Sequence, residues 1–396
     1  MDGGSERQLI GELGELLERG TTAMAPEIRY EPSTSYTDPE RQARERDLLF
    51  RRYPLVVATS SELPTAGDFT TSSIAGLPVL TVRGDDGQVR CLVNICRHRG
   101  NQVCMQESGN KRVFHCEYHA WTYDRAGRLR SPVDREGFAD LPNGDFGLIT
   151  LPTEERHGLI WTLPTPGAVL DVLAHLGPEF DRELADLNLG HFTLYARTVF
   201  EQPFNWKLAA DTFHEVFHLA YLHKKTVGPL FIGNVGAYQE WGLHHRYSAV
   251  RKSFAEMLQQ SVEEQSIYPH SSLVHLLFPN TLVTWQMDHI ETWRFYPSAG
   301  RDDACIVEGA MLVPEAPTTD SARRHWDNNW RILMATILDE DFATMTRIQR
   351  NLETGAVKEL AFGRNEVALQ HFHSGLHAEL DRHRSTSTGR ESSRAH

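Results

Sequence analysis

Residues 96–121, CRHRGNQVCMQESGNKRVFHCEYHAW, hold two pairs of side chains that commonly bind metals. The first pair is Cys96 and His98, the second is Cys116 and His119, and 17 residues separate the pairs. Thiolate and imidazole groups at such short spacings can bind one metal from a single loop. Because each pair lies in a β-rich context, we expect the four side chains to converge from two hairpin tips on a metal ion or cluster.

The order of these ligands favours iron and sulfur over zinc. Zinc sites usually combine Cys with Cys and His with His. A Cys-x-His pair followed by a Cys-x-x-His pair matches the Rieske 2Fe–2S centre, in which two thiolates hold one iron and two imidazoles the other. Neutral imidazole reduces the negative charge of the cluster and so favours its reduced form. The other thiols, Cys91, Cys104 and Cys305, are expected only to pack.

Composition and charge restrict the remaining function classes. A chain of 396 residues predicts more than one domain. With 40 basic and 53 acidic residues the formal charge is −13, which argues against nucleic acid or an anionic membrane as a partner. The sequence has no apolar stretch typical of a signal peptide or a membrane span, and five cysteines do not predict a disulfide framework. We therefore expect a cytoplasmic enzyme.

Hydrophobic patterns predict an α+β fold. Hairpin signals at Asp86-Gly87 and near Ala126-Gly127 indicate a small all-β domain, and later alternating and helical runs predict an antiparallel sheet with helices. The helical runs include residues 203–223 and residues 320–353, the second with Asp320 or Ser321 as its N-cap. The expected segments are a helical start of the catalytic domain over residues 1–46, the all-β domain over 47–165, the catalytic domain over 166–383, and a disordered tail over 384–396.

Residues 214–218, HEVFH, carry the H-E-x-x-H pattern of a zinc protease. A metzincin needs a glycine and a third histidine at fixed positions beyond this pattern. Here His223 follows His218 by five residues and no glycine lies between them. A protease would also leave the Cys and His pairs without a purpose, so a zinc peptidase is a remote alternative.

The chain resembles the large (α) subunit of Rieske non-haem iron oxygenases, the family that includes naphthalene dioxygenase and carnitine monooxygenase. The resemblance extends from about residue 36 to about residue 380. Besides the Cys and His pairs, it rests on three elements: Asn205-Trp206-Lys207, Asp211-Thr212-Phe213, and a carboxylate-x-Phe-His-x4-His element that begins at Glu215. It implies a small all-β Rieske domain inserted near the N-terminus of a helix-grip catalytic domain.

The resemblance also implies the roles of individual residues. It implies a Rieske 2Fe–2S cluster and a mononuclear Fe(II) site, for which two histidines and one carboxylate on one side leave the opposite positions open. Of the neighbouring acids 339–341, Asp341 best matches the family's spacing. The implied cluster ligands are Cys96, His98, Cys116 and His119, the implied iron ligands are His218, His223 and Asp341, and Glu215 is the implied bridging carboxylate.

Two features of this comparison bear on geometry. His218 and His223 lie roughly 140° apart around an ideal helix, so we expect a bulge or a helix end between them. Ala120 stands where the family usually has glycine, and Glu215 where it usually has aspartate, as in the carnitine-type branch. Thr212 replaces the usual asparagine, and these last two differences bear on the substrate.

The resemblance implies a multicomponent oxygenase. Electrons from NAD(P)H enter through a flavin reductase, with or without a ferredoxin, and three subunits form a ring in which His119 of one chain contacts Glu215 and then His218 of the next. We expect mono- or dioxygenation of an aromatic or alicyclic ring; a quaternary ammonium substrate and a Rieske electron-transfer protein without catalysis are alternatives. The expected lining of the substrate pocket is Phe213, Phe217, Leu219, Trp285, Trp293 and Phe295.

Overall fold

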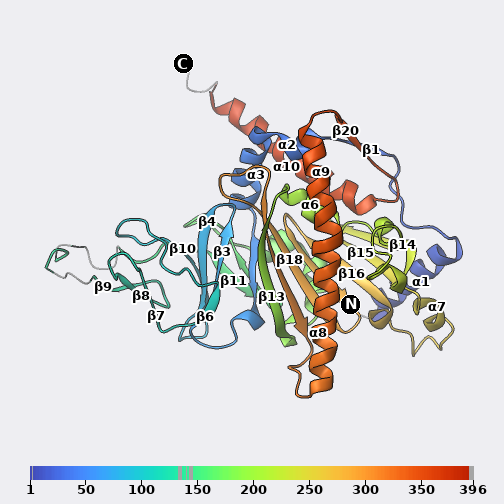
Figure 1. Cartoon of the computed structure of the whole chain (residues 1–396), viewed down its shortest axis with the longest axis horizontal. Helices are drawn as coiled ribbons and strands as arrows, with labels where there is room; N and C mark the ends of the chain where they lie inside the picture. The colour runs from blue at the N-terminus through green and yellow to red at the C-terminus, as the bar shows by residue number, and fades with distance from the viewer. Residues whose placement is uncertain (2, 133–135, 140, 142–145, 392–396) are drawn as a thin grey trace. The chain divides into compact units, whose positions relative to one another are not determined.

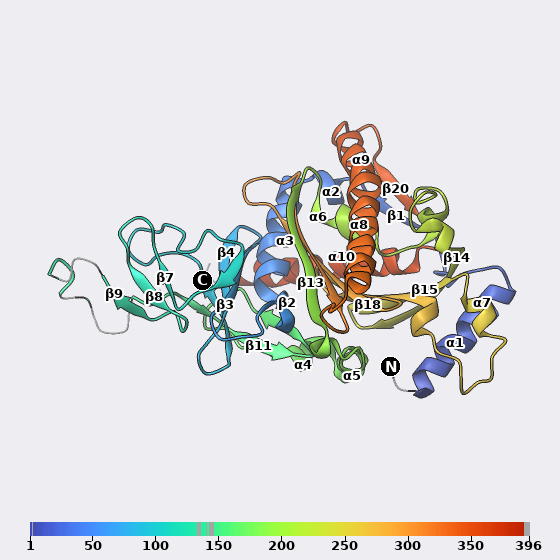
Figure 2. The same ribbon diagram turned by 60° about the horizontal axis from the view of Figure 1, so that its bottom comes forward.

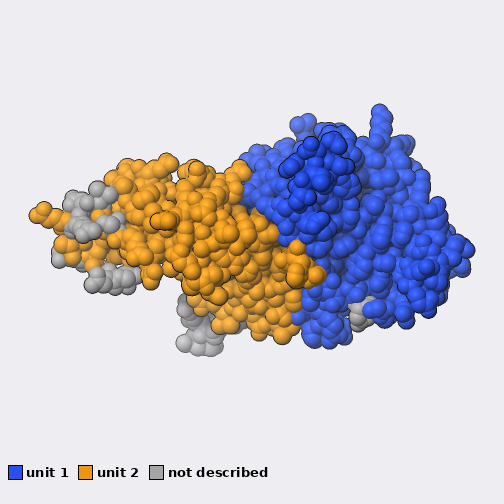
Figure 3. Space-filling view, turned by 90° about the horizontal axis from the view of Figure 1, so that it is seen from below, with its two compact units in different colours: residues 1–49, 176–187, 192–396 blue, residues 50–175, 188–191 orange. Residues whose placement is uncertain are grey.

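The computed structural model describes residues 1, 3–132, 136–139, 141 and 146–391. These residues divide into two compact units, which Figure 3 colours separately. The larger unit comprises residues 1–49, 176–187 and 192–396, and the smaller comprises residues 50–175 and 188–191. No helix of the described chain is both long enough and apolar enough to cross a membrane.

The smaller unit is built from three antiparallel sheets. The five-stranded sheet has the order β10 (Thr150–Leu151), β5 (Val89–Val93), β4 (Leu77–Arg83), β3 (Asp68–Ile74) and β6 (Ser108–Asn110). The other two sheets are β11 (Thr153–Arg156), β12 (Leu159–Thr162) and β2 (Leu55–Thr59), and β7 (Val113–His115), β8 (Thr122–Asp124) and β9 (Leu129–Ser131). Both hairpins predicted from turn residues, β4–β5 and β8–β9, are confirmed.

The larger unit contains a seven-stranded antiparallel sheet. Its order is β13 (Thr193–Gln202), β19 (Cys305–Val313), β18 (His289–Pro297), β17 (Thr281–Gln286), β16 (Ser271–Leu277), β15 (His244–Arg251) and β14 (Phe231–Trp241). Strands β15, β16 and β18 are buried along nearly their whole length, because helices and loops cover the sheet. The sheet with its helices confirms the α+β prediction.

A long helical segment crosses this sheet, as Figures 1 and 2 show. It consists of α8 (Asp320–Met334), the π-helix η6 (Ala335–Phe342) and α9 (Ala343–Glu353). Trp326 and Trp330 of α8 pack on Met311 and Val313 of β19. Thr319 is the N-cap of α8, one residue before Asp320, the first of the two predicted caps. Its Oγ1 accepts a hydrogen bond from the amide of Ala322.

The helix predicted over residues 203–223 is shorter than expected. It comprises α6 (Trp206–Asp211), followed after a turn by the 3₁₀ helix η3 (Phe217–Ala220). Asn205 caps the start of α6 by accepting a hydrogen bond from the amide of Lys207. At the other end the hydroxyl of Thr212 donates to the carbonyl of Ala209, a bond that satisfies a carbonyl left free where the helix ends.

Segments near the two ends of the chain lie side by side in the larger unit. Strand β1 (Arg29–Pro32) pairs with β20 (Glu359–Phe362). The helix α10 (Val367–Glu391) continues through residues 384–391, where the sequence predicted a disordered tail; residues 392–396 lie outside the described residues. Buried side chains anchor the start of α10, and a helix without proline then extends at little cost. Other helices of the described residues are α1 (Gly3–Glu18), α2 (Thr34–Thr37), α3 (Pro39–Arg52), α4 (Val172–Leu176), α5 (Pro178–Asp186) and α7 (Phe254–Met257). Short 3₁₀ helices are η1 (Ser60–Glu62), η2 (Leu189–His191), η4 (Gly228–Leu230) and η5 (Tyr268–His270).

Candidate metal centres

The four predicted cluster residues lie on two adjacent loops of the smaller unit. Cys96 and His98 follow β5, and Cys116 and His119 connect β7 to β8. Each loop is closed by its own backbone: the carbonyl of Cys96 accepts from the amide of Gly100, and the carbonyl of Cys116 accepts from the amide of Ala120. The rings of His98 and His119 are 4.6 Å apart between centroids.

Surrounding side chains hold both loops and both sulfurs. The side chain of Asn94 accepts hydrogen bonds from the amides of Val103 and Cys104 and donates to the carbonyl of Cys104, which fixes the first loop. The hydroxyl of Tyr123 accepts from the amide of Arg97 and lies 3.3 Å from the Sγ of Cys96. Burial and the neighbouring thiol raise the pKa of Tyr123, so its hydroxyl keeps its proton and can donate it to the sulfur.

The pKa of Cys116 lies below its ordinary value. Burial alone raises the pKa of a thiol, but the amides of Tyr118 and His119, the thiol of Cys96 and the side-chain amide of Asn101 outweigh it here. The thiolate is the form that binds metals. Beside it, the Nδ1 atom of His98 is buried and has no hydrogen-bond partner. Two buried cysteine sulfurs and an imidazole nitrogen without a protein partner fit a bound metal cluster.

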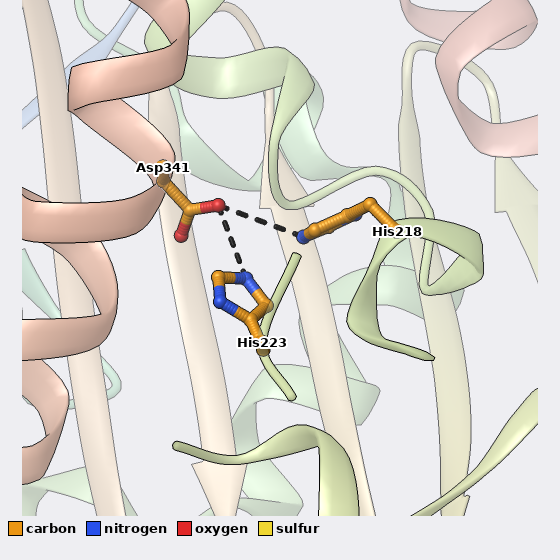
Figure 4. Close-up of side chains that lie close together, drawn as sticks. All are labelled: His218, His223 and Asp341. Atoms are coloured by element: carbon orange, nitrogen blue, oxygen red, sulfur yellow. Dashed lines mark ion pairs between the residues drawn. The ribbon is translucent and has the colours of Figure 1, made fainter. Parts of the chain in front are cut away.

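The larger unit brings together His218, His223 and Asp341, as Figure 4 shows. Their ligand atoms all lie within 4.8 Å of one another. The Oδ1 of Asp341 is 3.6 Å from Nε2 of His218 and 3.1 Å from Nε2 of His223. This oxygen is buried and makes no aligned hydrogen bond. Two imidazole nitrogens and one carboxylate oxygen that face a common point without bonding to one another fit a divalent metal.

A second carboxylate orients each histidine. Nδ1 of His218 contacts Oε1 of Glu215, whose Oε2 accepts from the amide of the same histidine. Nδ1 of His223 lies 2.6 Å from Oε2 of Glu340, which also accepts from the hydroxyl of Thr226. With Nδ1–H donated to a carboxylate, each ring directs the lone pair of Nε2 toward the common point. Burial lowers the pKa of His223, but the carboxylates of Asp341 and Glu340 outweigh it and raise that pKa.

Local departures from the α-helix permit this arrangement. His218 lies in the 3₁₀ helix η3 and His223 follows its end, so the two rings meet at 4.9 Å between centroids. The expected distortion between the two histidines is therefore a helix end. Glu340 and Asp341 lie in the π-helix η6 and contact the two nitrogens of the same His223 ring. In an α-helix neighbouring residues point about 100° apart, which makes such a shared target harder to reach.

His214, the first histidine of the H-E-x-x-H pattern, lies outside this group. Its ring is fully buried against His245 and Phe372, with centroid distances of 5.1 and 4.6 Å. Neither ring nitrogen has a hydrogen-bond partner, and burial lowers the pKa of His214 to about 3. A zinc protease requires both histidines of the pattern on one metal, and the described residues do not bring His214 and His218 together.

A cavity of about 220 Å³ opens beside the three residues of Figure 4. Of the six residues expected to line it, Phe213 and Leu219 do so. Phe217 is exposed, and Trp293 and Phe295 lie behind Phe213, each with its ring centroid 5.8 Å from that of Phe213. Trp285 packs against Phe192 and Tyr268 instead of lining the cavity. The sequence expectation was therefore wrong for these four rings; α6 packs on β18, the strand that carries Trp293 and Phe295.

Two family profiles match the chain. The Rieske 2Fe–2S domain matches residues 53–140, and the ring hydroxylating alpha subunit (catalytic domain) matches residues 189–381. The chain belongs to the family of Rieske ring-hydroxylating oxygenase α subunits. The cofactors of these two domains are a Rieske 2Fe–2S cluster and a mononuclear iron, and the donor sets described above fit both.

Curated relatives of this α subunit include mono- and dioxygenases. It is 32% identical over 215 residues to the biphenyl 2,3-dioxygenase subunit alpha of Rhodococcus jostii, which covers 52% of this chain and 44% of the relative. It is 32% identical over 235 residues to the carnitine monooxygenase oxygenase subunit of Escherichia coli, which covers 58% of this chain and 60% of the relative. The chain thus spans about half the length of these curated relatives.

Solved structures share the fold of this α subunit over nearly its whole length. A quaternary ammonium Rieske monooxygenase superposes with a TM-score of 0.76 at 20% identity, covering 90% of this chain and 96% of the other. Naphthalene 1,2-dioxygenase from Rhodococcus sp. superposes with a TM-score of 0.73 at 21% identity, covering 94% and 98%. At these identities the likeness concerns the fold.

Sequence reasoning overlooked two functional neighbours in this α subunit. The sequence indicates Glu340 only as one of three neighbouring acids at the expected ligand position, and it indicates no role for Thr226. The signal that could have found Glu340 is chemical: a metal-bound histidine needs a partner for its second nitrogen, and an acid adjacent to a ligand on the same helix is a natural source.

Proposed function

We propose that the chain is the terminal oxygenase component of a multicomponent Rieske system. In this proposal it uses O₂ and electrons from NAD(P)H, delivered by a flavin reductase with or without a ferredoxin, to hydroxylate a small organic molecule. The observation that carries the proposal is the grouping of His218, His223 and Asp341 beside a cavity. A Rieske protein that only transfers electrons has no need of such a site.

The ligand assignments form part of this proposal. The Rieske cluster is assigned to Cys96, His98, Cys116 and His119, and the mononuclear iron to His218, His223 and Asp341. Bound there, the two centres supply electron transfer and O₂ activation. The chain's own residues prepare the sites: Tyr123 holds a hydrogen bond on the sulfur of Cys96, and Glu340 fixes the ring of His223.

The cavity lining has a separate part in this function. Apolar side chains on one side exclude water and hold a substrate close to the three ligands, and reactions that involve O₂ benefit from a site closed to water. Leu219, Ile332, Leu333 and Ile337 supply this surface. We place an aromatic or alicyclic ring against it, as for the biphenyl dioxygenase relative.

A quaternary ammonium substrate is the second candidate. The relative that acts on carnitine and the glutamate at position 215 favour it. Recognition of such a cation needs several aromatic faces around it. Among the described lining residues, Phe213 and Phe231 are the carbocyclic aromatic side chains, so the ring substrate is placed first.

Electron transfer is proposed to cross between subunits of a cyclic trimer. In this arrangement His119 of one chain contacts Glu215 of the next, and Glu215 contacts His218 of its own chain. The second half of this path is visible in the contacts of Glu215 with the ring and amide of His218. A head-to-tail interface between identical chains closes into such a ring.

One experiment tests the function as a whole. The purified protein is assayed for iron and acid-labile sulfide, and a panel of ring compounds and quaternary amines is then turned over with a reductase, scored by coupled use of O₂ and NADH. We expect iron and sulfide in every preparation and turnover of at least one ring compound. Zinc without sulfide, or coupled turnover confined to the amines, contradicts the proposal.

A second experiment tests the path between subunits. Glu215→Gln, loaded with excess iron so that both metals are present, is expected to show a sharp fall in single-turnover product, because the amide loses the charge that favours an imidazole N–H. Trimers that combine a His119→Ala chain with a Glu215→Gln chain should regain activity at interfaces where an intact cluster meets an intact bridge. Absence of recovery in demonstrably mixed trimers means that transfer stays within one chain.

A further inference from the structure

Arg251 brings a cation into the cavity and forms no ion pair with a carboxylate of the described residues, although the charges of Asp288 and Glu291 act on it from farther away. It is the last residue of β15 and lines the same cavity as His218, His223 and Asp341. Its Nε atom is buried and has no hydrogen-bond partner, and no carboxylate of a described residue lies within ion-pair distance of its guanidinium. The group lies over the ring of Phe231, 5.0 Å from the centroid.

The carboxylates nearest to Arg251 are already engaged by other groups. Oδ1 of Asp288 lies 2.9 Å from Nδ1 of His289, and its Oδ2 lies 2.9 Å from Nε2 of His325. Glu291 accepts from the indole of Trp293, and its other oxygen lies 3.4 Å from Nε2 of His289. Burial opposes the charge of His289, but Asp288 and Glu291 raise its pKa to about 9, so this histidine is a cation at neutral pH. The guanidinium of Arg251 therefore has neither of these carboxylates as an ion-pair partner.

Two more polar atoms of the same cavity have no hydrogen-bond partner. They are the Oγ1 of Thr284 and the Oε1 of Gln286, both on β17 and both buried. A buried polar atom without a partner is destabilising, so such atoms are usually satisfied by a bound group or by water. Together they give the cavity a polar side formed by β15 and β17. Apolar side chains from outside the sheet also line the cavity: Leu219, Val227, Leu230, Ile332, Leu333 and Ile337.

We infer that the cavity takes a small molecule with an apolar, ring-sized body and an anionic group, most simply a carboxylate, which Arg251 binds. This inference rests on the proposed oxygenase function and specifies its substrate class. A guanidinium presents parallel N–H donors that match the two oxygens of a carboxylate. The volume agrees, because a cavity of about 150 Å³ accommodates benzene and this one measures about 220 Å³.

The same feature disfavours a substrate whose only charge is positive. A quaternary ammonium group near Arg251 would meet a like charge in a partly enclosed cavity, where repulsion is stronger than at the surface. The carboxylates that could attract it, Asp288 and Glu291, are bound to His289. Arg251 thus disfavours a purely cationic amine, whereas a zwitterionic betaine has a carboxylate that Arg251 can bind.

Three probes of similar size test the inference: benzoate, its neutral analogue benzamide, and phenyltrimethylammonium. Their binding to the complete protein with its metals is measured by calorimetry under argon, without reductant. We expect benzoate to bind at least tenfold more tightly than benzamide, and phenyltrimethylammonium to bind most weakly. Equal affinity for benzoate and benzamide, or tighter binding of the cation, overturns the inference. This comparison needs no variant.

Variants then assign the effect to one side chain. Arg251→Gln should lose the preference for benzoate and keep the affinity for benzamide within about twofold, while Arg251→Lys should keep part of the preference because it keeps the charge but loses the planar fork. Arg324→Gln, at an exposed position of α8, is the matched control. A preference for benzoate that survives in Arg251→Gln overturns the assignment.

The binding experiment and the turnover experiment can contradict the anion site and the oxygenase function independently of each other. Because these measurements use neither O₂ nor electrons, loss of the benzoate preference in a protein that contains iron and turns over a neutral ring compound contradicts only the anion site. A protein that lacks iron, or that turns over nothing with a competent reductase, contradicts the oxygenase function itself.

Discussion

The Cys/His site and the iron site solve the same problem of ligand placement in different ways. In the first, all four residues come from two loops between residues 96 and 119, and the backbone bonds of each loop set the positions of its own side chains. In the second, the residues lie between positions 218 and 341 along the chain, and carboxylates on neighbouring side chains orient the two imidazoles. Local spacing can therefore specify the first site but only part of the second.

This difference also predicts how each site responds to substitution. Backbone bonds in the loops survive a change of most side chains, with Asn94 as the exception because its side chain fixes the first loop. The orientation of His218 and of His223 depends in each case on one carboxylate. The iron site should be the more sensitive of the two to substitutions outside its ligands.

The largest expected effect comes from removing a ligand of the iron site. Asp341→Ala should lower oxygenation by more than about 100-fold, because Asp341 is, among the described residues, the carboxylate that lies near both Nε2 atoms. It should leave the electron paramagnetic resonance spectrum of the reduced cluster unchanged. Asp339→Ala, at the exposed position two residues earlier, is the control and should have little effect. If the cluster signal disappears as well, the two sites are not independent. If Asp339→Ala instead abolishes oxygenation, the iron ligand is Asp339, two residues before the proposed Asp341.

The next effect concerns orientation. Glu340→Gln should weaken iron binding by about 10–100-fold, because the amide no longer holds the Nδ1–H of His223 with a full charge. Iron content after dialysis against a chelator measures it, with Asp339→Asn as the neighbouring control. Iron retention equal to that of the wild type would show that Thr226 or the backbone holds this ring, and the contrast between the two sites would be smaller than described.

A third effect concerns acid stability near the iron-site segment. His214 is buried and its pKa is lowered from 6.5 to about 3, so the unfolded chain binds a proton that the folded chain does not. Above pH 6.5 His214 does not lower the stability of the folded chain. As the pH falls from 6.5 toward 3, protonation of His214 in the unfolded chain lowers the free energy of unfolding, by about 2 kcal/mol at pH 5.

His214→Leu should therefore move the acid-unfolding midpoint to lower pH, as followed by tryptophan fluorescence. His191→Leu, at an exposed histidine of the smaller unit, is the control and should leave the midpoint in place. An unchanged midpoint in His214→Leu would mean that other groups govern acid unfolding.

The smallest effect lies in the Cys/His site. Ala120 has a φ of 54°, in the left-handed region, which costs a residue with a Cβ about 1–2 kcal/mol. Ala120→Gly should relieve this strain and, after the entropic cost of glycine, stabilise the protein by about 0.5–1 kcal/mol in thermal unfolding. Ala126→Gly, in the next hairpin, should not stabilise. A loss of stability in Ala120→Gly would show that this loop carries no strain.

The sequence predicted different parts of the molecule to different depths. The hairpin at Asp86-Gly87, an antiparallel sheet with helices and the Cys/His pairs follow from local rules. The structure contains the hairpin and the sheet, and it places the rings of His98 and His119 4.6 Å apart, whereas β14 and β15 were not predicted. The early end of α6 was missed because the apolar pattern continues beyond Asp211 while Thr212 and the following residues leave the helix. The role of Glu340 was missed because it depends on a π-helix, which sequence periodicity does not indicate.

The pocket was the least predictable part. Trp293 and Phe295 occupy the same strand face as His289 and Glu291, and only the position of α6 decides which of them face the cavity. Arg251 gave no signal in the sequence, because a single arginine at a strand end is usually exposed. Whether Arg251 can bind an anionic ligand depends on which nearby carboxylates are already paired with other residues, and only the folded chain shows this.

The division of the larger unit along the chain has a consequence for synthesis. Residues 1–49 leave the ribosome before the rest of the larger unit, but β1 must wait for its partner β20, and His223 must wait for Asp341. The smaller unit is complete earlier: it ends at residue 191, which is 150 residues before Asp341, or about 8–30 s at 5–20 residues per second. Cluster insertion can therefore begin while the larger unit is still being made, whereas iron loading has to wait for Asp341.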